Sequence, residues 1–489
     1  MSTPASPRMP LDGGKSPQAS NEALAAAMAF ANEDDEPSLH TTAIVPRGDE
    51  RFLPVTRYAL IDRLSSPQVW PAGMAGEARR FFRYLDYWRK QRYSAALTRL
   101  QEAYEPFSPD SDLFVTRHYT DAERREMLAE VMGGVNNLLT QANYTVVPRE
   151  KIAATIMSKD SHYGLDLTVD FDTFEELVVA FRGESVAKAH RRKLSRFFRR
   201  EEFSVPIFRR MVVLFKLKTP EKHIEDVRDH LKVTEEEATK KVRRMRADIS
   251  SEIKPGNVYI KVFKNIPKSD VEMVFPNTEV KFRMRDKVWL GITGGGALGA
   301  GVFGAAGKLA LAFSNPITAA GAVGGIGMVL FRQVMNVTNQ KQRYMRVLAQ
   351  NLYFHSMADN SGAMSELAER AAEEDVKEEI LLYSILAKER VNRSELRDVD
   401  SAIQAYIERT FGLQVDFEID DALHRLIADG IVQEDAAGNL IAKPPGKAAE
   451  HIDGMWDRIL DMLPNESSIV GREIDKPHGA KPNGSARAI

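Results

Sequence analysis

Five charged residues, among them Lys268, lie close together from Lys261 to Glu272, and the types and spacing of the other four could support chemistry. Lys261 and Lys264 fall on a predicted strand, and Asp270 and Glu272 follow it. Residues two apart on a strand share a face, so the two carboxylates could bind a metal ion or share a proton. The alternative is an ion-paired strand end in which Pro267 sets a turn. These four charged residues are the candidate catalytic residues of the sequence.

Other reactive arrangements are missing from the sequence. The chain has no cysteine, which removes disulfides, cysteine–zinc sites and thiol nucleophiles. Among the ten histidines, His223 and His230 stand two helical turns apart, but no third ligand completes a metal-binding spacing. No Ser–His–Asp set can be placed. We therefore predict no metal site and no cofactor. We expect a non-enzymatic protein, with an enzyme that uses the Lys261–Glu272 block as the alternative.

A strongly basic segment covers residues 188–218, where eleven Lys or Arg side chains meet two Glu, a net charge of +9. Phenylalanines are interleaved with these cations, as in proteins that stack on nucleic acid bases. Attraction to anionic lipid headgroups is a second interpretation, and a solvated helix face followed by a strand is the third. The predicted anionic-surface-binding residues are Arg191, Arg192, Lys193, Arg196, Arg199, Arg200, Arg209 and Arg210.

The segment from Val288 to Val337 is almost free of charge and is broken once, at Ser314-Asn315-Pro316. Each half is long enough, as a helix, to cross a hydrocarbon core of about 30 Å, so the segment predicts a two-helix transmembrane hairpin. Small residues four apart let two helices approach closely in lipid. A buried soluble hairpin and a glycine-rich nucleotide loop are the alternatives. The predicted membrane-packing residues are Gly291, Gly295, Gly299, Gly321 and Gly325.

Basic residues flank both ends of this hairpin, which sets the expected topology. Lys281, Arg283 and Arg285 precede it, and Arg332 and Lys341 follow it. Because basic loops stay on the cytoplasmic side, both termini are expected there. The sequence therefore predicts a multi-pass membrane protein with two spans, placed in the inner membrane if the source is bacterial.

The regions before the hairpin predict an α+β fold for residues 51–287, after a disordered tail over residues 1–50. Helical periodicity covers residues 77–104 and 120–141, and a third helix follows Pro148. The spacing then changes to a period of two, which indicates strands within residues 167–181, 205–217 and 258–263. A charged insert over residues 221–249 predicts a helix that begins at Thr234, with Glu237 completing a capping box.

After the hairpin we expect a connecting helix over residues 338–372 and a winged-helix-like domain over residues 373–445. Three predicted helices, 376–388, 398–410 and 418–429, precede two short strands. Residues 373–443 hold 17 acids and 8 bases, a net charge of −9. A third helix this acidic would repel a nucleic acid backbone, so the predicted partner is a protein. Residues 446–489 are expected to form a helix and a disordered tail.

Three blocks of this sequence resemble the transmembrane protein 143 family. The first is Arg51-Phe52-Leu53-Pro54-Val55 with Arg57, and the second includes Val205-Pro206-Ile207-Phe208-Arg209-Arg210. The third is Lys261-Val262-Phe263-Lys264-Asn265-Ile266-Pro267, followed by Asp270, Glu272 and Pro276. The resemblance covers about residues 51–390. It implies a membrane protein with no established activity and no assigned catalytic residues.

Taken together, the sequence predicts a non-enzymatic scaffold or adaptor anchored in a membrane, with its large domains on the cytoplasmic face. The formal net charge of the 489 residues is only −2, so no global field points to a partner. The expected partners are the lipid bilayer, anionic lipid headgroups, a protein at the acidic C-terminal domain and further copies of the chain. A membrane tether for nucleic acid is a further alternative, although no nucleic acid partner is expected.

Overall fold

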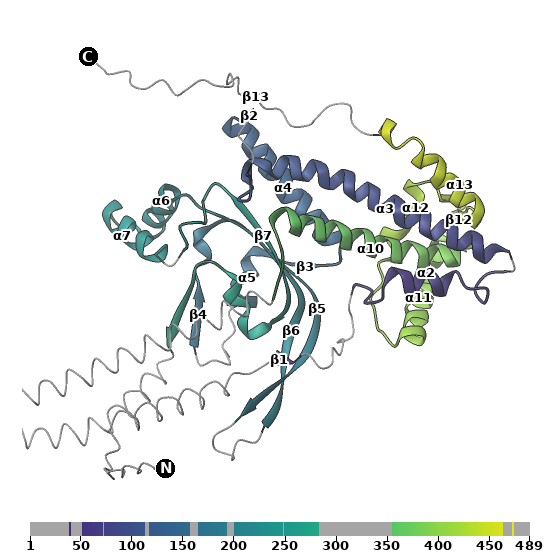
Figure 1. Ribbon diagram of the computed structural model, residues 1–489, viewed down its shortest axis with the longest axis horizontal. Helices are drawn as coiled ribbons and strands as arrows, with labels where there is room; N and C mark the ends of the chain where they lie inside the picture. The colour runs from purple at the N-terminus through teal and green to yellow at the C-terminus, as the bar shows by residue number, and fades with distance from the viewer. Residues whose placement is uncertain are drawn as a thin grey trace, which may run out of the picture. The chain divides into compact units, whose positions relative to one another are not determined.

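The computed structural model describes residues 39–40, 51–71, 73–112, 117–156, 165–192, 200–247, 249–282, 355–462 and 472–473. The fold is mixed α and β, and its strand pairings are antiparallel, as expected for an α+β chain (Figure 1). Two compact units divide the chain: residues 1–45 with 185–206, and residues 46–184 with 207–489. The described helices lie in the second unit, as do the two cavities discussed below.

Helices α2 (Arg57–Leu64) and α4 (Asp121–Gln141) begin at threonine caps. Helix α2 begins after Thr56, whose side chain accepts a hydrogen bond from the Ala59 amide. Helix α4 has a complete capping box between Thr120 and Glu123. Helix α3 (Met74–Tyr104) ends where Pro106 opens the 3-10 turn η1 (Glu105–Phe107), and α5 (Arg149–Ile156) follows Pro148. The predicted helices are confirmed.

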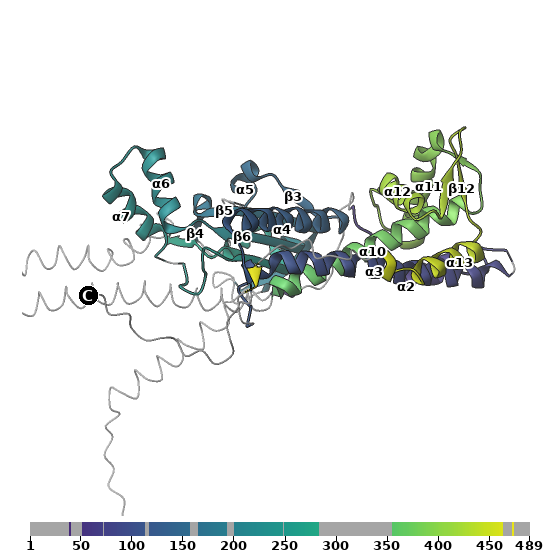
Figure 2. The same cartoon turned by 90° about the horizontal axis from the view of Figure 1, so that it is seen from above.

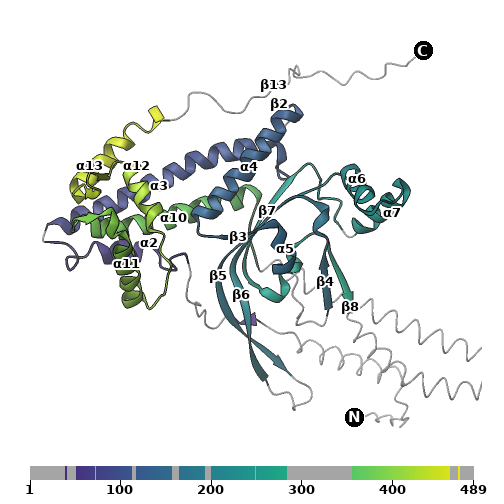
Figure 3. The ribbon, with the colours of Figure 1, turned by 180° about the vertical axis from the view of Figure 1, so that it is seen from behind.

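The main sheet has the strand order β1-β5-β6-β7-β9, and β3 (Thr145–Val147) pairs with β5. Strands β5 (Phe174–Arg192) and β6 (Arg200–Leu217) are long and curved in Figures 1 and 3. The register places Arg210 of β6 opposite Lys264 of β7 (Val258–Pro267). Strand β9 (Ser356–Asp359) closes the edge next to β7.

In the first unit, β1 (Leu39–His40) pairs with β5, with Leu39 opposite Ala189. The predicted disordered tail, residues 1–50, is described only at these two residues. The interpretation of the basic segment as a solvated helix face followed by a strand needs correction. Arg191 and Arg192 lie on strand β5, and Arg200 lies on β6. Branched and aromatic residues on both sides of the basic run favour the extended conformation.

Smaller elements complete the second unit. Strand β4 (Leu165–Val169) pairs with β8 (Thr278–Phe282), and a two-residue pair joins β2 (Arg117–His118) to β13 (Arg472–Glu473). Strand β4 leads through a short turn, η2 (Phe171–Thr173), into β5, and η4 (Lys268–Val274) connects β7 to β8. The charged insert folds as two helices, α6 (Pro220–Leu231) and α7 (Glu235–Met245). The Thr234 hydroxyl accepts from the Glu237 amide, which confirms the predicted start of α7.

The C-terminal part is built around α10 (Asn360–Leu386). The predicted domain boundary at residue 373 therefore falls inside a helix. Next come β10 (Val391–Asn392), η5 (Arg393–Glu395), α11 (Leu396–Phe411) and α12 (Ile419–Ala428). Helix α11 ends at Gly412, whose φ of 67° suits glycine. Strands β11 (Val432–Glu434) and β12 (Asn439–Ala442) then pair, and β10 adds a third strand next to β12. Helix α13 (Pro445–Trp456) and η6 (Leu460–Met462) follow.

One apolar core joins the start of the second unit to its C-terminal part. Figure 2 shows α11, α12 and β12 grouped at the end of α10, with α13 lying along α3. Tyr383 of α10 packs on Phe81 of α3, with ring centroids 4.4 Å apart, and its hydroxyl donates to the Lys443 carbonyl at 2.7 Å. Burial of large aromatic side chains of this kind contributes strongly to stability.

The sequence predicts a membrane protein with two spans and both termini cytoplasmic, and this prediction is wrong. We find no helix in the described ranges that combines the length and the apolar character needed to cross a membrane. The longest, α3, carries charged residues such as Arg83, Asp86 and Arg89 along its length, which a hydrocarbon core disfavours. The hairpin Val288–Val337 itself, with Gly291, Gly295, Gly299, Gly321 and Gly325, lies outside the described residues.

Gly183 of β5 has a φ of 72°, and a Cβ there would meet Arg209 Cδ at 3.0 Å and Phe52 Cε1 at 3.1 Å. Replacing Gly183 with alanine is expected to lower the free energy of unfolding by about 1–2 kcal/mol or more, because an L side chain is disfavoured at this φ. Urea unfolding measures the change. Gly256→Ala is the matched control, since nothing lies within 4 Å of its added Cβ. Equal losses in both variants would contradict the expected steric cost.

Candidate functional site

The structure does not gather the four catalytic candidates into a single described cluster. Lys261 forms its ion pair with Asp359 at 3.1 Å, and Lys264 is exposed. Glu272 is buried at 2 % exposure within η4, and the side chain of Asp270 lies outside the described residues. Among the described residues we find no group of His, Asp or Glu placed to hold a metal ion.

Of the eight predicted anionic-surface-binding residues, the described part of the chain places only two side chains, those of Arg209 and Arg210. Lys193, Arg196 and Arg199 lie outside the described residues, and only the backbone is described at Arg191, Arg192 and Arg200. Arg209 lies over the Phe52 ring, 5.5 Å from its centroid, and Arg210 donates to the Arg209 carbonyl at 3.0 Å.

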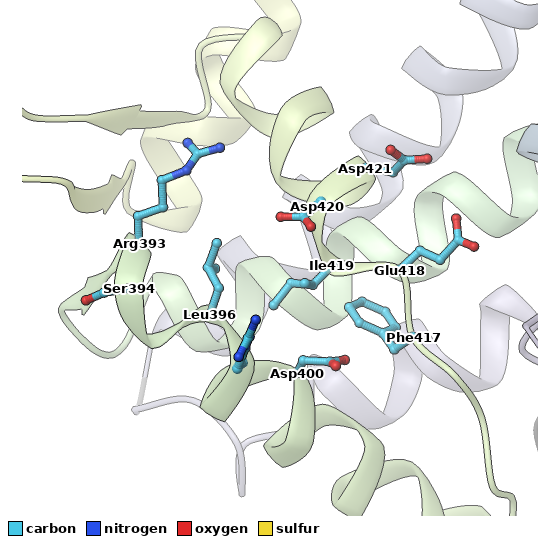
Figure 4. A pocket seen from close by; sticks show the side chains of 10 residues that line it. Arg393, Ser394, Leu396, Asp400, Phe417, Glu418, Ile419, Asp420 and Asp421 are labelled. Carbon is cyan, nitrogen blue, oxygen red and sulfur yellow. The ribbon is translucent and has the colours of Figure 1, made fainter.

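A groove with a volume of about 680 Å³ opens between the start of α11 and the start of α12 (Figure 4). Buried Leu396, Phe417 and Ile419 provide apolar lining. Carboxylates surround this lining, and Figure 4 shows Asp400 facing the α12 end of the groove. The acidic residues of the groove are Asp400, Glu418, Asp420 and Asp421.

The acids of this groove are only partly neutralised. Two arginines, Arg393 and Arg397, also line it, but Arg393 pairs with Glu434 of β11. Burial and the nearby carboxylates of Asp416 and Asp420 raise the pKa of Asp400. Within the described part of the chain, no ion pair reaches Asp420 or Asp421, and both are exposed. A cation that entered the groove would therefore gain favourable electrostatic interactions.

The arginine of α12 is used internally. Arg425 approaches three carboxylates of α10: Asp375 at 3.2 Å, Glu378 at 2.6 Å and Glu379 at 2.9 Å. Its side chain is largely buried. The exposed face of α12 is left with Asp420, Asp421 and His424. The described face of this helix therefore presents no arginine or lysine to a nucleic acid backbone.

A second arginine, Arg89 of α3, extends this cluster into a buried charge network. Its Nε donates to Glu379 at 2.8 Å, and a short ion pair joins it to Asp429 at the end of α12. Trp88 Nε1 also donates to Asp429, at 3.2 Å, and Tyr93 donates to Asp375 at 2.8 Å. We call this set the α3–α10–α12 network: Arg89, Tyr93, Asp375, Glu378, Glu379, Arg425 and Asp429.

The network was not predicted from the sequence. The acidic run in the second half of α10 has the composition of a solvated helix face, yet Glu374, Asp375, Glu378 and Glu379 are buried. Burial raises the pKa of Asp375 to about 7 and that of Glu378 to about 8. Asp429, at the end of the predicted third helix 418–429, also belongs to the network.

Comparisons with known proteins identify little of the chain. A family model described as "Protein of unknown function (DUF3754)" matches residues 208–362. A curated relative, the 2-dehydro-3-deoxy-D-gluconate 5-dehydrogenase of Pseudoalteromonas atlantica (strain T6c / ATCC BAA-1087), is 33 % identical over 96 residues. That match covers 18 % of this chain and 36 % of the relative, so the chain spans about a third of the relative's length. No solved structure matches.

Proposed function

We propose that this protein is a non-enzymatic scaffold or adaptor whose C-terminal part binds a basic segment of a partner protein. The observation that carries the proposal is the acidic groove between α11 and α12, in which Asp420 and Asp421 are exposed and lack ion pairs within the described residues. Apolar lining from Phe417 and Leu396 would favour the aliphatic stems of lysine or arginine. Such a groove suits a peptide better than a phosphate backbone.

We propose a winged-helix-like module for this C-terminal part. The order α10, α11, α12 and then the β11–β12 hairpin supports it, as does the third strand β10. In DNA-binding members of such folds the third helix enters the major groove. Here the arginine of that helix is turned into the α3–α10–α12 network, which favours protein binding.

The sequence resemblance to the transmembrane protein 143 family remains a proposal as well. It implies no established activity, which is compatible with a non-enzymatic scaffold. We do not transfer dehydrogenase activity from the curated relative, because the match covers only 36 % of that protein. The candidate occupant of the groove with known sequence is the basic stretch of residues 188–200, supplied by a second copy. Its seven Lys or Arg residues, with no acid among them, complement the acids of the groove.

The test measures binding of a labelled peptide with the sequence of residues 188–200 to the full-length protein. Converting Asp420 and Asp421 together to asparagine is expected to weaken binding about tenfold, because two partly solvated charge contacts are lost. Asparagine keeps the size of the side chains and tolerates the first turn of a helix. Binding should also weaken as salt concentration rises, since exposed charges are screened.

Glu389→Gln is the control, because Glu389 is exposed on the same module but lies outside the groove. Its affinity for the peptide should match that of the unaltered protein. Salt-independent binding, or equal affinity in the double variant, would argue against the groove. Tight binding of duplex DNA that is lost in the double variant would replace the protein partner with nucleic acid.

A further inference from the structure

A second cavity, of about 200 Å³, lies among residues 52–56, β5, β6 and α10. Five cationic side chains line it, together with two carboxylates, Glu373 and Glu374. Five positive and two negative charges leave a formal excess of three positive charges. The cations are Arg182, Arg209, Arg210, Arg370 and Lys377.

Arg370 and Lys377 are paired with carboxylates at 3.0 Å or less and serve the fold. Arg370 donates to Glu366 at 3.0 Å and to Glu373 at 2.9 Å. Lys377 donates to Glu374 at 2.9 Å and to the Leu53 carbonyl at 2.7 Å, so it ties α10 to the loop at residues 52–56. Of the other cations, Arg182 shares Glu374 with Lys377 at the longer distance of 3.5 Å, and Arg210 is considered with it below.

Arg182 and Arg210 are incompletely neutralised by the protein. Arg182 is buried at 8 % exposure; its Nη1 donates to the Ala142 carbonyl at 2.9 Å and lies 3.5 Å from Glu374, while its Nε has no hydrogen-bond partner. Arg210 donates to a backbone carbonyl, and the described part of the chain brings no carboxylate within salt-bridge distance of it. Burial, and then the charges of Arg182 and Arg370, lower the pKa of Arg210.

Aromatic packing fixes two of these guanidinium groups in place. The Phe52 ring lies 4.7 Å from the Arg182 guanidinium and 5.5 Å from that of Arg209, and Tyr144 lies 5.1 Å from Arg182. Gly183 favours this approach, because a Cβ there would lie only 3.0 Å from Arg209 Cδ and 3.1 Å from Phe52 Cε1. Such stacking positions the planar donors before a ligand arrives.

We infer that this cavity binds a compact phosphate group, free or at the end of a small metabolite. Guanidinium groups match phosphate oxygens with paired hydrogen bonds, and a dianion would offset the repulsion between Arg182 and Arg210. The volume suits one or two phosphate groups rather than a long polymer. Two blocks of the family resemblance, residues 51–57 and 205–210, contribute Phe52 and the Arg209–Arg210 pair to this cavity.

The test uses the full-length protein and follows thermal unfolding and calorimetric binding with pyrophosphate and with inorganic phosphate. A ligand that binds the native state raises the unfolding temperature in a saturable way. Sodium chloride at equal ionic strength provides the comparison for screening alone. We expect saturable stabilisation by the phosphates that chloride does not reproduce.

Arg210→Gln is expected to weaken phosphate binding at least tenfold, and Arg209→Gln should also weaken it. Arg243→Gln, on the exposed surface of α7, is the matched control and should leave binding unchanged. Because Arg210 is repelled by its neighbours, Arg210→Gln should unfold at the same or a higher temperature without ligand, so loss of binding will not reflect loss of fold. Stabilisation equal to that by chloride, or an unchanged phosphate affinity in Arg210→Gln, would overturn the inference.

Discussion

Replacing Arg89 with methionine is expected to lower the free energy of unfolding by about 3–5 kcal/mol, because removal of one partner leaves buried charges uncompensated. Arg89 is within hydrogen-bond distance of Glu379 and forms an ion pair with Asp429, and all three side chains are almost fully buried. Methionine fills a similar volume, so the loss of charge compensation should dominate over any cavity. Urea unfolding of the full-length protein, followed by tryptophan fluorescence, measures the change.

Arg92→Met is the matched control for this experiment. Arg92 lies one turn further along α3 and also approaches Asp429, at 3.6 Å, but more than half of its side chain is exposed. Exposed ion pairs contribute about 0–1 kcal/mol, so this variant should be nearly as stable as the unaltered protein. Similar losses in the two variants would show that burial of the network does not determine its contribution.

The capped helices are the part of the fold that the sequence predicts best. The caps Thr120 of α4 and Thr234 of α7 carry their signals within four residues, so no tertiary information is needed. The stop of α11 at Gly412 and the strand-forming run at residues 205–217 are local in the same sense. These predictions are confirmed because neighbouring side chains determine them.

The α3–α10–α12 network could not be predicted, because its members pair across long distances in the sequence. Arg89 meets Glu379 and Asp429, which lie 290 and 340 residues away along the chain. A sequence window around Glu374–Glu379 contains one lysine and no arginine, so it resembles a solvated acidic face. The arginines that pair with these buried acids come from α3, β5 and α12.

The two candidate sites also differ in how far the sequence predicts them. The acidity of the C-terminal part was visible in its composition, and the groove beside Asp420 and Asp421 agrees with it. The convergence of Arg182 and Arg370 with Arg209 and Arg210 was not visible, because it requires β5, β6 and α10 to meet. Composition thus indicates the sign of a surface charge, whereas only packing shows which charges are buried and paired.

The same network should make stability depend on pH in an unusual direction. Its buried carboxylates are Asp375, Glu378, Glu379 and Asp429, and its buried cations are Arg89 and Arg425. Full ionisation would leave two negative charges in excess. Burial is the main cause that raises the pKa of Asp375 to about 7 and that of Glu378 to about 8, while Arg425 opposes the shift of both. One or both groups therefore hold a proton near neutral pH.

Other groups that face these two carboxylates bear on the same titration. Tyr93 and Arg89 approach from α3, and Asn143 donates to Glu378 at 3.0 Å. The side-chain oxygen of Gln141, at the end of α4, accepts from Arg425 at 3.3 Å. Glu374 and Glu379 approach from α10 itself, and like charges there favour protonation. The pair is expected to titrate as a coupled unit rather than as two independent residues.

The sign follows from the difference between the two states. In the unfolded chain both carboxyl groups ionise near their usual pKa of about 4, whereas the native protein keeps their protons up to about pH 7–8. The native state therefore binds more protons between these limits, and the network contributes most below about pH 4. Its contribution falls as pH rises, by up to about 1.4 kcal/mol per pH unit for each group, and levels off above about pH 8.

Glu378→Gln isolates this effect from the other titrations of the chain, because glutamine can still accept from Asn143 but cannot ionise. Relative to the unaltered protein, the variant is expected to gain at least about 1 kcal/mol of stability when the pH is raised from 5 to 8. Urea unfolding at each pH gives the difference. Glu369→Gln, exposed on the same helix, should show no such gain. If the stability difference between Glu378→Gln and the unaltered protein is constant from pH 5 to 8, then Glu378 is already ionised in the native state and Arg425 outweighs the cost of its burial.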